Sequence, residues 1–215
     1  MQIQNGSKLV MIGDSITDCN RAKPIGEGLF EAYGSGYVNL VNGMLTGFYP
    51  EKRIRVVNMG TSGNTVRDLK ARWQTDVLDL KPDWLSIMIG INDVWRQFDS
   101  RLINEWQVPL EEYEKTLDEL VRTTKPLLQG LVMMTPYYIE PNKADAMRKT
   151  MDQYGAVVKQ LAARYDAIFV DTQSAFDEAL KTLHPNSLAW DRVHPGAAGH
   201  MIITRAFLKV VDFSW

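Results

Sequence analysis

Short apolar runs alternate with longer amphipathic stretches along the whole chain. The runs lie at residues 8–13, 54–60, 84–90, 130–136 and 167–172. Each run is continuously apolar rather than alternating, which is typical of a parallel strand that is covered on both faces. We therefore expect five parallel strands.

The segments between the runs have helical periodicity. In three of them apolar residues recur at spacings of three and four: Val66, Leu69, Trp73 and Val77; Leu110, Tyr113, Leu117, Leu120 and Val121; Met147, Met151, Tyr154, Val158 and Leu161. Strands that alternate with helices predict an α/β fold, a doubly wound three-layer α/β/α sandwich with a five-stranded parallel sheet. In such a fold the carboxyl ends of the strands meet at one edge, where ligands bind.

Composition limits the number of domains and the class of partner. The chain has 215 residues, of which 45% are hydrophobic, and no repeat or linker, so we expect a single domain over residues 1–215. Lysine plus arginine number 24 against 26 acidic residues, which leaves no basic field for nucleic acid or an anionic membrane. No segment approaches the ~20 apolar residues of a membrane span, and the N-terminal stretch does not resemble a signal peptide. We expect a cytoplasmic protein with a small-molecule partner.

Metal and cofactor signatures are weak in this sequence. Cys19 is the only cysteine, which excludes an internal disulfide and a multi-thiolate metal site. Asp191, His194 and His200 are ligand types, but their spacing matches no common zinc signature. A P-loop, a dinucleotide fingerprint and the Gly-x-Ser-x-Gly motif are also missing. We therefore expect neither a metal nor a cofactor.

Polar residues follow the first three apolar runs. The stretch "VMIGDSITD" presents Ser15 directly after the first run, the glycines of "MGTSGNT" include Gly63, and Asn92 follows the third run. Each could be an ordinary turn or helix cap. Together they bring a hydroxyl, a backbone amide and a carboxamide to one edge of the sheet. Acyl transfer requires such a set, a nucleophile with donors for the developing oxyanion.

Histidine supplies the general base that this chemistry needs. His194 lies three residues after Asp191 in "AWDRVHPGAAGH", so one turn can bring the carboxylate to the imidazole. Pro195 suits the first position of the closing helix, which would hold His194 at the helix entrance. His184 is expected in a surface loop. We expect His200 to be structural, because within a helix it points in another direction from a residue six positions earlier.

Four sequence blocks together resemble the SGNH hydrolases, also called GDSL-type esterases. The blocks are "GDS" at Ser15, "GTSGN" at Gly63, "GIND" at Asn92, and "DRVH" at Asp191 and His194. The resemblance implies a flavodoxin-like SGNH fold with Ser15 as nucleophile, His194 as base and Asp191 as its orienting carboxylate. It also implies an oxyanion hole formed by the Ser15 and Gly63 amides and the Asn92 side chain. The first block departs slightly, because it reads "GDSIT" where the family name has leucine.

Longer segments resemble one subgroup of this family. "IGDSITDC", "RVVNMGTSGNTVRDLKARW" and "KPDWLSIMIGINDVWRQ" are similar to the intracellular acetyl-xylooligosaccharide esterases of bacilli and their relatives. The resemblance implies a serine esterase that removes acetyl groups from acetylated xylooligosaccharides or xylan fragments, and a homo-oligomer. Two alternatives stay open: a short-chain lipolytic esterase or thioesterase on the same fold, and a non-catalytic carbohydrate-binding domain.

Candidate substrate-binding residues lie near the same predicted edge. Trp95 follows Asn92, Tyr137 follows the fourth run, and Trp190 precedes Asp191, so their rings could stack on a sugar. Ordinary packing or an oligomer interface is the alternative for each of them. Asp14 is the fourth candidate, although a local hydrogen-bonding role is favoured for it.

Two arginines and one segment have open roles. Arg67 and Arg96 could bond sugar hydroxyls or lie on the surface. The segment 97–108, with Trp106, could be a lid or a subunit contact.

Overall fold

A five-stranded parallel sheet in the order β2-β1-β3-β4-β5 forms the centre of the computed structural model, which describes residues 1–215. The strands are β1 (Lys8–Gly13), β2 (Arg55–Gly60), β3 (Trp84–Met88), β4 (Gly130–Met134) and β5 (Ile168–Val170). Each predicted run forms a strand, so the predicted α/β fold is confirmed. β3 ends at Met88, before the end of the apolar run 84–90, because the neighbouring strand β1 ends at Gly13, which pairs with Met88.

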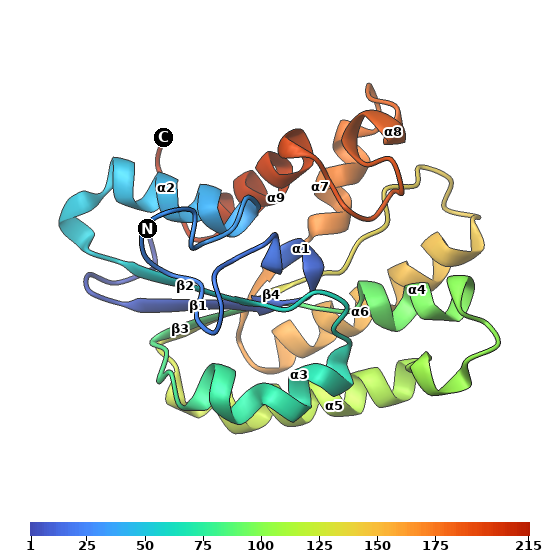
Figure 1. Ribbon diagram of the computed structural model, residues 1–215, viewed down its shortest axis with the longest axis horizontal. Coiled ribbons are helices and arrows are strands. Elements are labelled where there is room, and N and C mark those ends of the chain that lie inside the picture. Colours follow the sequence, from blue (N-terminus) through green and yellow to red (C-terminus); the bar gives the residue numbers. More distant parts are fainter.

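Helices cover both faces of the sheet (Figure 1). On one face lie α2 (Tyr37–Phe48), α7 (Thr172–Ala179) and α9 (Ala197–Val210). On the other lie α3 (Val66–Trp73), α5 (Leu110–Thr124) and α6 (Ala146–Arg164), with α4 (Ile91–Asp99) packed on α6. Short helices α1 (Ser15–Asp18) and α8 (Pro185–Leu188), a π-helical turn (Gln74–Leu78) and three 3-10 turns (Pro50–Lys52, Asn104–Trp106, Lys125–Leu127) complete the fold. The predicted periodic helices are α3, α5 and α6.

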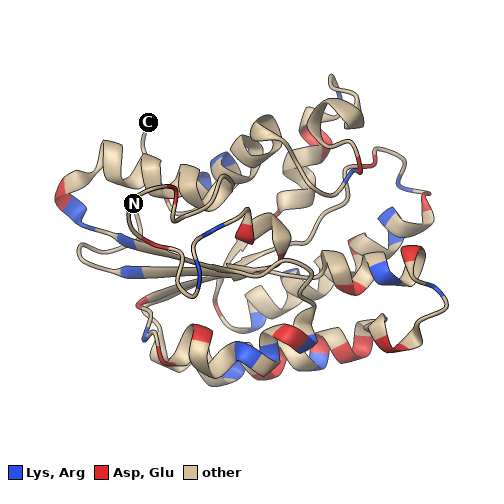
Figure 2. Ribbon diagram, in the orientation of Figure 1, with Lys and Arg blue, Asp and Glu red and all other residues tan.

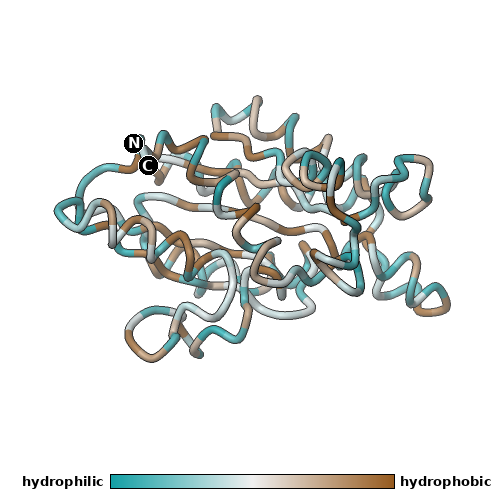
Figure 3. Tube along the Cα trace, turned by 90° about the horizontal axis from the view of Figure 1, so that it is seen from above, coloured by the Kyte–Doolittle hydropathy of each residue, from teal (hydrophilic) through white to brown (hydrophobic).

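The hydrophobic core forms one contiguous cluster of 52 buried residues. Figure 3 shows hydrophobic segments along the inside of the molecule, and a few more on outer loops among hydrophilic residues. In Figure 2 acidic and basic residues are interspersed on the outer helices, so neither sign of charge dominates a face. None of the helices combines the length and apolar composition that a membrane span needs.

The register of the strands positions the functional groups. β1, β2 and β3 run in register, with Gly13 opposite both Gly60 and Met88, so the loops that follow these strands leave the sheet at one edge. The two ends of the chain also lie side by side (Figure 1), because the Gln2 backbone N–H donates to the Val211 carbonyl over 2.8 Å.

Candidate active site

Ser15 occupies the first position of α1, directly beyond β1. Asp14 caps this helix: its carboxylate accepts a hydrogen bond from the Ile16 N–H at 3.0 Å. The turn is tight at Gly13, where a Cβ would lie 2.3 Å from the Met88 carbonyl oxygen and 2.4 Å from Thr17 Oγ1. Because only glycine fits there, the chain passes abruptly from strand to helix and presents Ser15 at the sheet edge.

A hydrogen-bonded chain runs from Ser15 through His194 to Asp191. Ser15 Oγ lies 2.9 Å from His194 Nε2, and His194 Nδ1 lies 2.6 Å from Asp191 Oδ2. The other Asp191 oxygen accepts from the backbone N–H groups of Val193 and His194 at 3.0 and 2.8 Å. Burial raises the pKa of Asp191, but the hydrogen bonds from His194 and Val193 outweigh it and hold that pKa below its ordinary value. The carboxylate is therefore charged and fixed against the imidazole.

The entrance to α9 differs from the prediction. The helix begins at Ala197, with Gly196 as its extended N-cap, so Pro195 is not the first helical residue. Pro195 instead packs on the first turn, where a Cβ on Gly199 would lie 2.4 Å from its Cβ. His194 consequently stands on the loop before the helix, where the Asp191 carboxylate accepts its backbone N–H.

Gly63 lies in the turn after β2, and this turn is tied to the nucleophile helix. The backbone and hydroxyl of Ser62 both donate to Asp18 Oδ2 at 3.0 Å, and Asp18 closes α1. Gly63 has a φ of +81°, a conformation that favours glycine. The N–H groups of Gly63 and Ser15 have no partner within the protein, so both can donate to a ligand.

Asn92 is the second residue of α4, which begins immediately after β3. Gly90 makes this abrupt start possible with a φ of +131°. Asn92 Nδ2 donates one hydrogen to the Asn64 carbonyl at 2.9 Å, which leaves its second hydrogen free. Arg96, one turn later, lies 3.4 Å from Asn92 Oδ1. The carboxamide is thus held with Nδ2 as donor.

These groups face a common cavity of about 550 Å³, which we call the catalytic pocket. Its walls carry Ser15, Cys19, Asn20, Ser35, Ser62, Gly63, Asn92, Trp95, Arg96, His194, Pro195, Gly196, Ala197 and His200. The structure therefore brings a hydroxyl, an imidazole and three amide donors from distant parts of the chain to one opening. Chemically, this set can attack an ester carbonyl and stabilise the oxyanion that forms.

Residues 11–202 match the model of the GDSL-like Lipase/Acylhydrolase family. The chain belongs to this family. It is 63% identical over 215 residues to an acetylxylan esterase of Geobacillus stearothermophilus, with 100% of this chain and 98% of that protein covered. This confirms the resemblance to GDSL-type hydrolases that the sequence blocks indicated.

Solved structures extend the comparison of this GDSL-like protein. Catalytic mutants S15A, D191A and H194A of the Geobacillus enzyme Axe2 match with a TM-score of 0.99 at 63% identity, covering 100% of this chain and 98% of theirs. LAE5, an alpha/beta hydrolase enzyme from the metagenome of Lake Arreo, Spain, matches with a TM-score of 0.98 at 57% identity, covering 99% and 98% of the two chains.

Two of the four candidate substrate-binding residues are enclosed in the GDSL-like fold. Asp14 is 1% exposed and Tyr137 0% exposed, so neither can touch a bound sugar, and both predictions are corrected. Tyr137 stacks on Phe176 with ring centroids 4.3 Å apart and donates its hydroxyl to the Val193 carbonyl, which supports the loop that carries His194. Burial raises the pKa of Asp14 to about 7.

The two tryptophan candidates differ in position. Trp95 lines the catalytic pocket, and its ring centroid lies 5.8 Å from that of His194. Trp190 is 83% exposed and lies outside the pocket wall, although it precedes Asp191 in the chain. Of the predicted sugar-stacking residues, only Trp95 is placed where a substrate in the pocket would meet it.

The other histidines have structural contacts. His200 lies in the pocket wall; its Nδ1 accepts the Tyr37 N–H at 3.2 Å and its Nε2 lies 3.3 Å from Cys19 Sγ. Burial lowers the pKa of His200 to about 4, so this ring is neutral and supports the neighbouring backbone. His184 caps α8 by accepting the Asn186 N–H at 3.2 Å.

The sequence analysis did not predict helix α4, and so it did not connect Arg96 with Asn92. Asn92 and Arg96 are four residues apart, which places them on one helix face, and that spacing was the available signal. Ser62 was likewise missed, because its contact to Asp18 joins segments that are distant in sequence. No three His, Cys, Asp or Glu side chains come together in a way that could hold a metal ion.

Proposed function

We propose that this chain is a serine esterase that removes acetyl groups from acetylated xylooligosaccharides or xylan fragments. The observation that carries this proposal is the continuous contact from Ser15 Oγ through the His194 ring to the Asp191 carboxylate, opening into the catalytic pocket. The 63% identity to the Geobacillus acetylxylan esterase supports the choice of an acetylated sugar as substrate.

The geometry suggests a two-step reaction. His194 Nε2 takes the proton of the Ser15 hydroxyl while Ser15 Oγ attacks the acetyl carbonyl. The oxyanion accepts hydrogen bonds from the Ser15 and Gly63 amides and from Asn92 Nδ2. The sugar hydroxyl then leaves with the proton held by His194. Water, deprotonated by the same imidazole, then attacks the acetyl carbon; the bond to Ser15 Oγ breaks, acetate leaves, and His194 returns the proton to Ser15 Oγ.

The wall of the catalytic pocket favours a short acyl group. It contains no Val, Leu, Ile, Met or Phe, and its larger side chains are polar or aromatic. A long acyl chain needs an apolar groove, because burying methylene groups drives its binding. A lipolytic enzyme or thioesterase on the same fold is therefore less well supported than a deacetylase.

Acetate release decides between these activities. We expect release from acetylated xylooligosaccharides, and rates on simple esters that fall from acetyl to octanoyl, with Ser15→Ala as the inactive control. Rates that rise with acyl length would instead support the lipolytic alternative. A phosphonylating serine reagent should add mass to Ser15; failure to label would favour a non-catalytic carbohydrate-binding domain.

Three further proposals concern the domain organisation, the oligomeric state and the cellular location of the protein. A single domain over residues 1–215 is supported by the contiguous core. A homo-oligomer is supported by large exposed hydrophobic side chains, including Phe30 at 96% and Trp190 at 83%, and light scattering would measure its mass. The solitary cysteine agrees with a cytoplasmic location, which cell fractionation would test.

A further inference from the structure

A second cavity, of about 480 Å³, adjoins the catalytic pocket. The two cavities share the wall residues Gly63 and Arg96. The remaining walls of the second cavity are Thr65, Arg67, Asp68, Glu105 and Trp106. Because Gly63 offers its amide to the oxyanion in the proposed reaction, this cavity lies directly beside the position of the reacting acetyl group.

The second cavity has the chemistry of a sugar site. Trp106 is its one large hydrophobic wall residue and is 53% exposed, so an indole face is available for stacking. Two carboxylates also line the cavity, those of Asp68 and Glu105. One oxygen of Asp68 accepts hydrogen bonds from Thr65, while its other oxygen and the Glu105 carboxylate have no partner in the protein. A pyranose ring combines a C–H face, which packs on an aromatic ring, with hydroxyls that donate to carboxylates.

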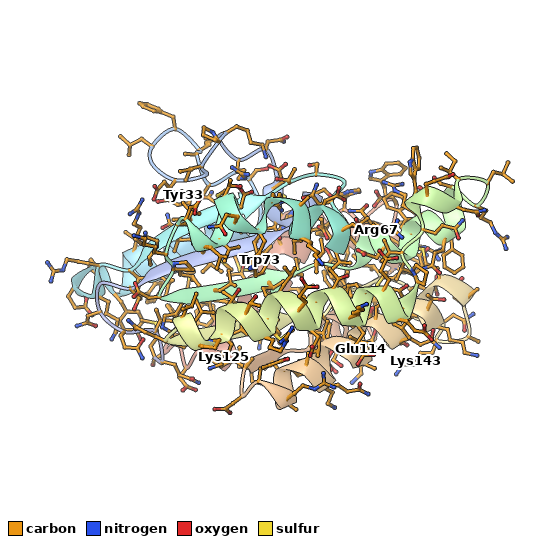
Figure 4. The ribbon with its side chains drawn as sticks, turned by 90° about the horizontal axis from the view of Figure 1, so that it is seen from below. Tyr33, Arg67, Trp73, Glu114, Lys125 and Lys143 are labelled. Carbon is orange, nitrogen blue, oxygen red and sulfur yellow. The ribbon has the colours of Figure 1, made fainter.

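The turn that presents Trp106 is held in place by one guanidinium. Arg67 donates to the carbonyls of Glu105 and Gln107, on either side of Trp106, at 2.7 and 3.0 Å. It also makes two hydrogen bonds to the Glu112 carboxylate of α5, at 2.5 and 2.6 Å. In Figure 4 the labelled Arg67 lies at the end of α3 that faces this region. The backbone of the turn that carries Trp106 is therefore held before any ligand arrives, which lowers the entropic cost of binding.

We propose that this cavity, the Trp106 subsite, binds an unacetylated sugar unit next to the unit whose acetyl group is removed. This inference rests on the proposed deacetylase function. The Trp106 subsite makes the enzyme selective for acetylated oligosaccharides over acetylated monosaccharides, because only a longer sugar chain reaches both cavities. Trp106 acts on substrate choice, apart from the chemical step at Ser15.

The test compares kcat/KM for acetylated xylotetraose with kcat/KM for acetylated xylose. We expect Trp106→Ala to lower this ratio about tenfold, equivalent to about 1.4 kcal/mol, and Trp106→Phe to retain most of it. Leu102→Ala is the matched control, because Leu102 is 98% exposed in the same segment and lines neither cavity. An unchanged ratio in Trp106→Ala would overturn the subsite.

A binding measurement separates this inference from the proposed function. Ser15→Ala is titrated with unacetylated xylotetraose by calorimetry, alone and combined with Trp106→Ala. Weaker binding in the double variant supports the subsite even if the wild-type protein releases no acetate from sugars, a result that would refute only the proposed reaction. Equal affinities, or no binding to Ser15→Ala, would refute the subsite.

Discussion

Replacing Asn92 with alanine tests whether its carboxamide stabilises the oxyanion. One Nδ2 hydrogen is used by the Asn64 carbonyl and the other is free, so the substitution removes one donor from the pocket. Loss of one such donor lowers kcat about 10²–10³-fold, or about 2.7–4 kcal/mol of transition-state stabilisation. KM should change little, because the contact strengthens only when charge develops on the carbonyl oxygen.

The same substitution also has a structural cost. Asn92 is 2% exposed, and its loss leaves the Asn64 carbonyl without its partner, which destabilises the fold by about 1–3 kcal/mol. Steady-state kinetics on an acetyl ester must therefore be paired with thermal unfolding, at a temperature where the variant is folded. Asn92→Asp adds a nearly isosteric test: it keeps the side-chain volume, replaces the donor with an acceptor and should be at least as inactive.

Asn5→Ala serves as the matched control, because Asn5 is exposed and lies before β1, at the other end of the strand from Ser15. It should keep wild-type kcat and KM. An unchanged kcat in folded Asn92→Ala would remove this residue from the proposed mechanism. A fall in kcat/KM that came only from KM would instead indicate ground-state binding.

Three further predictions concern titratable groups. Asp191→Asn should lower kcat about 10⁴-fold, because the imidazole is then held in the wrong tautomer. The same substitution made in Ser15→Ala should lower kcat no further, since these residues act as a unit, and additive losses in the double variant would contradict this. Burial raises the pKa of Asp93 from an ordinary 3.8 to about 7 in the folded protein. Between these two values the folded chain holds the proton and the unfolded chain does not, so the free energy of unfolding falls as the pH rises from about 4 to about 7. Urea unfolding at pH 5 and pH 8 measures how much the free energy of unfolding falls between these pH values, and this fall should be roughly 2–4 kcal/mol smaller in Asp93→Asn than in the wild-type protein. An identical fall in the two proteins would refute the prediction. Burial raises the pKa of the Cys19 thiol to about 12, so at pH 8 iodoacetamide should label it far more slowly in the native protein than in urea, whereas equal rates would show an accessible thiolate.

Strand positions and the polar groups that follow them were predictable, because both follow from local rules. A continuously apolar run indicates a strand buried on both faces, and parallel pairing carries the strand ends to one edge. The sequence therefore indicated that Ser15, Gly63 and Asn92 would lie near one another. Their distances depend on side-chain contacts such as Ser62 to Asp18, which join distant segments and leave no periodic pattern.

Helix α4 and Tyr137 show where sequence reasoning failed. α4 follows β3 with hardly any spacer, because Gly90 adopts a positive φ, and the run of apolar residues concealed the boundary. Beyond β4 the chain stays extended, and the Ile139 N–H donates to the Arg192 carbonyl at 2.9 Å. Tyr137 and Ile139 are both 0% exposed, while Tyr138 between them is half-buried. Two adjacent tyrosines gave no signal of which ring enters the core, so the burial of Tyr137 could not be predicted from the sequence.

The contact between Ser15 and His194 joins residues 179 positions apart. During translation a ribosome therefore adds every residue between them before the imidazole exists. Over that interval the growing polypeptide carries its nucleophile but cannot activate it. Hydrolysis can begin only after His194 has left the ribosome and folded against Ser15.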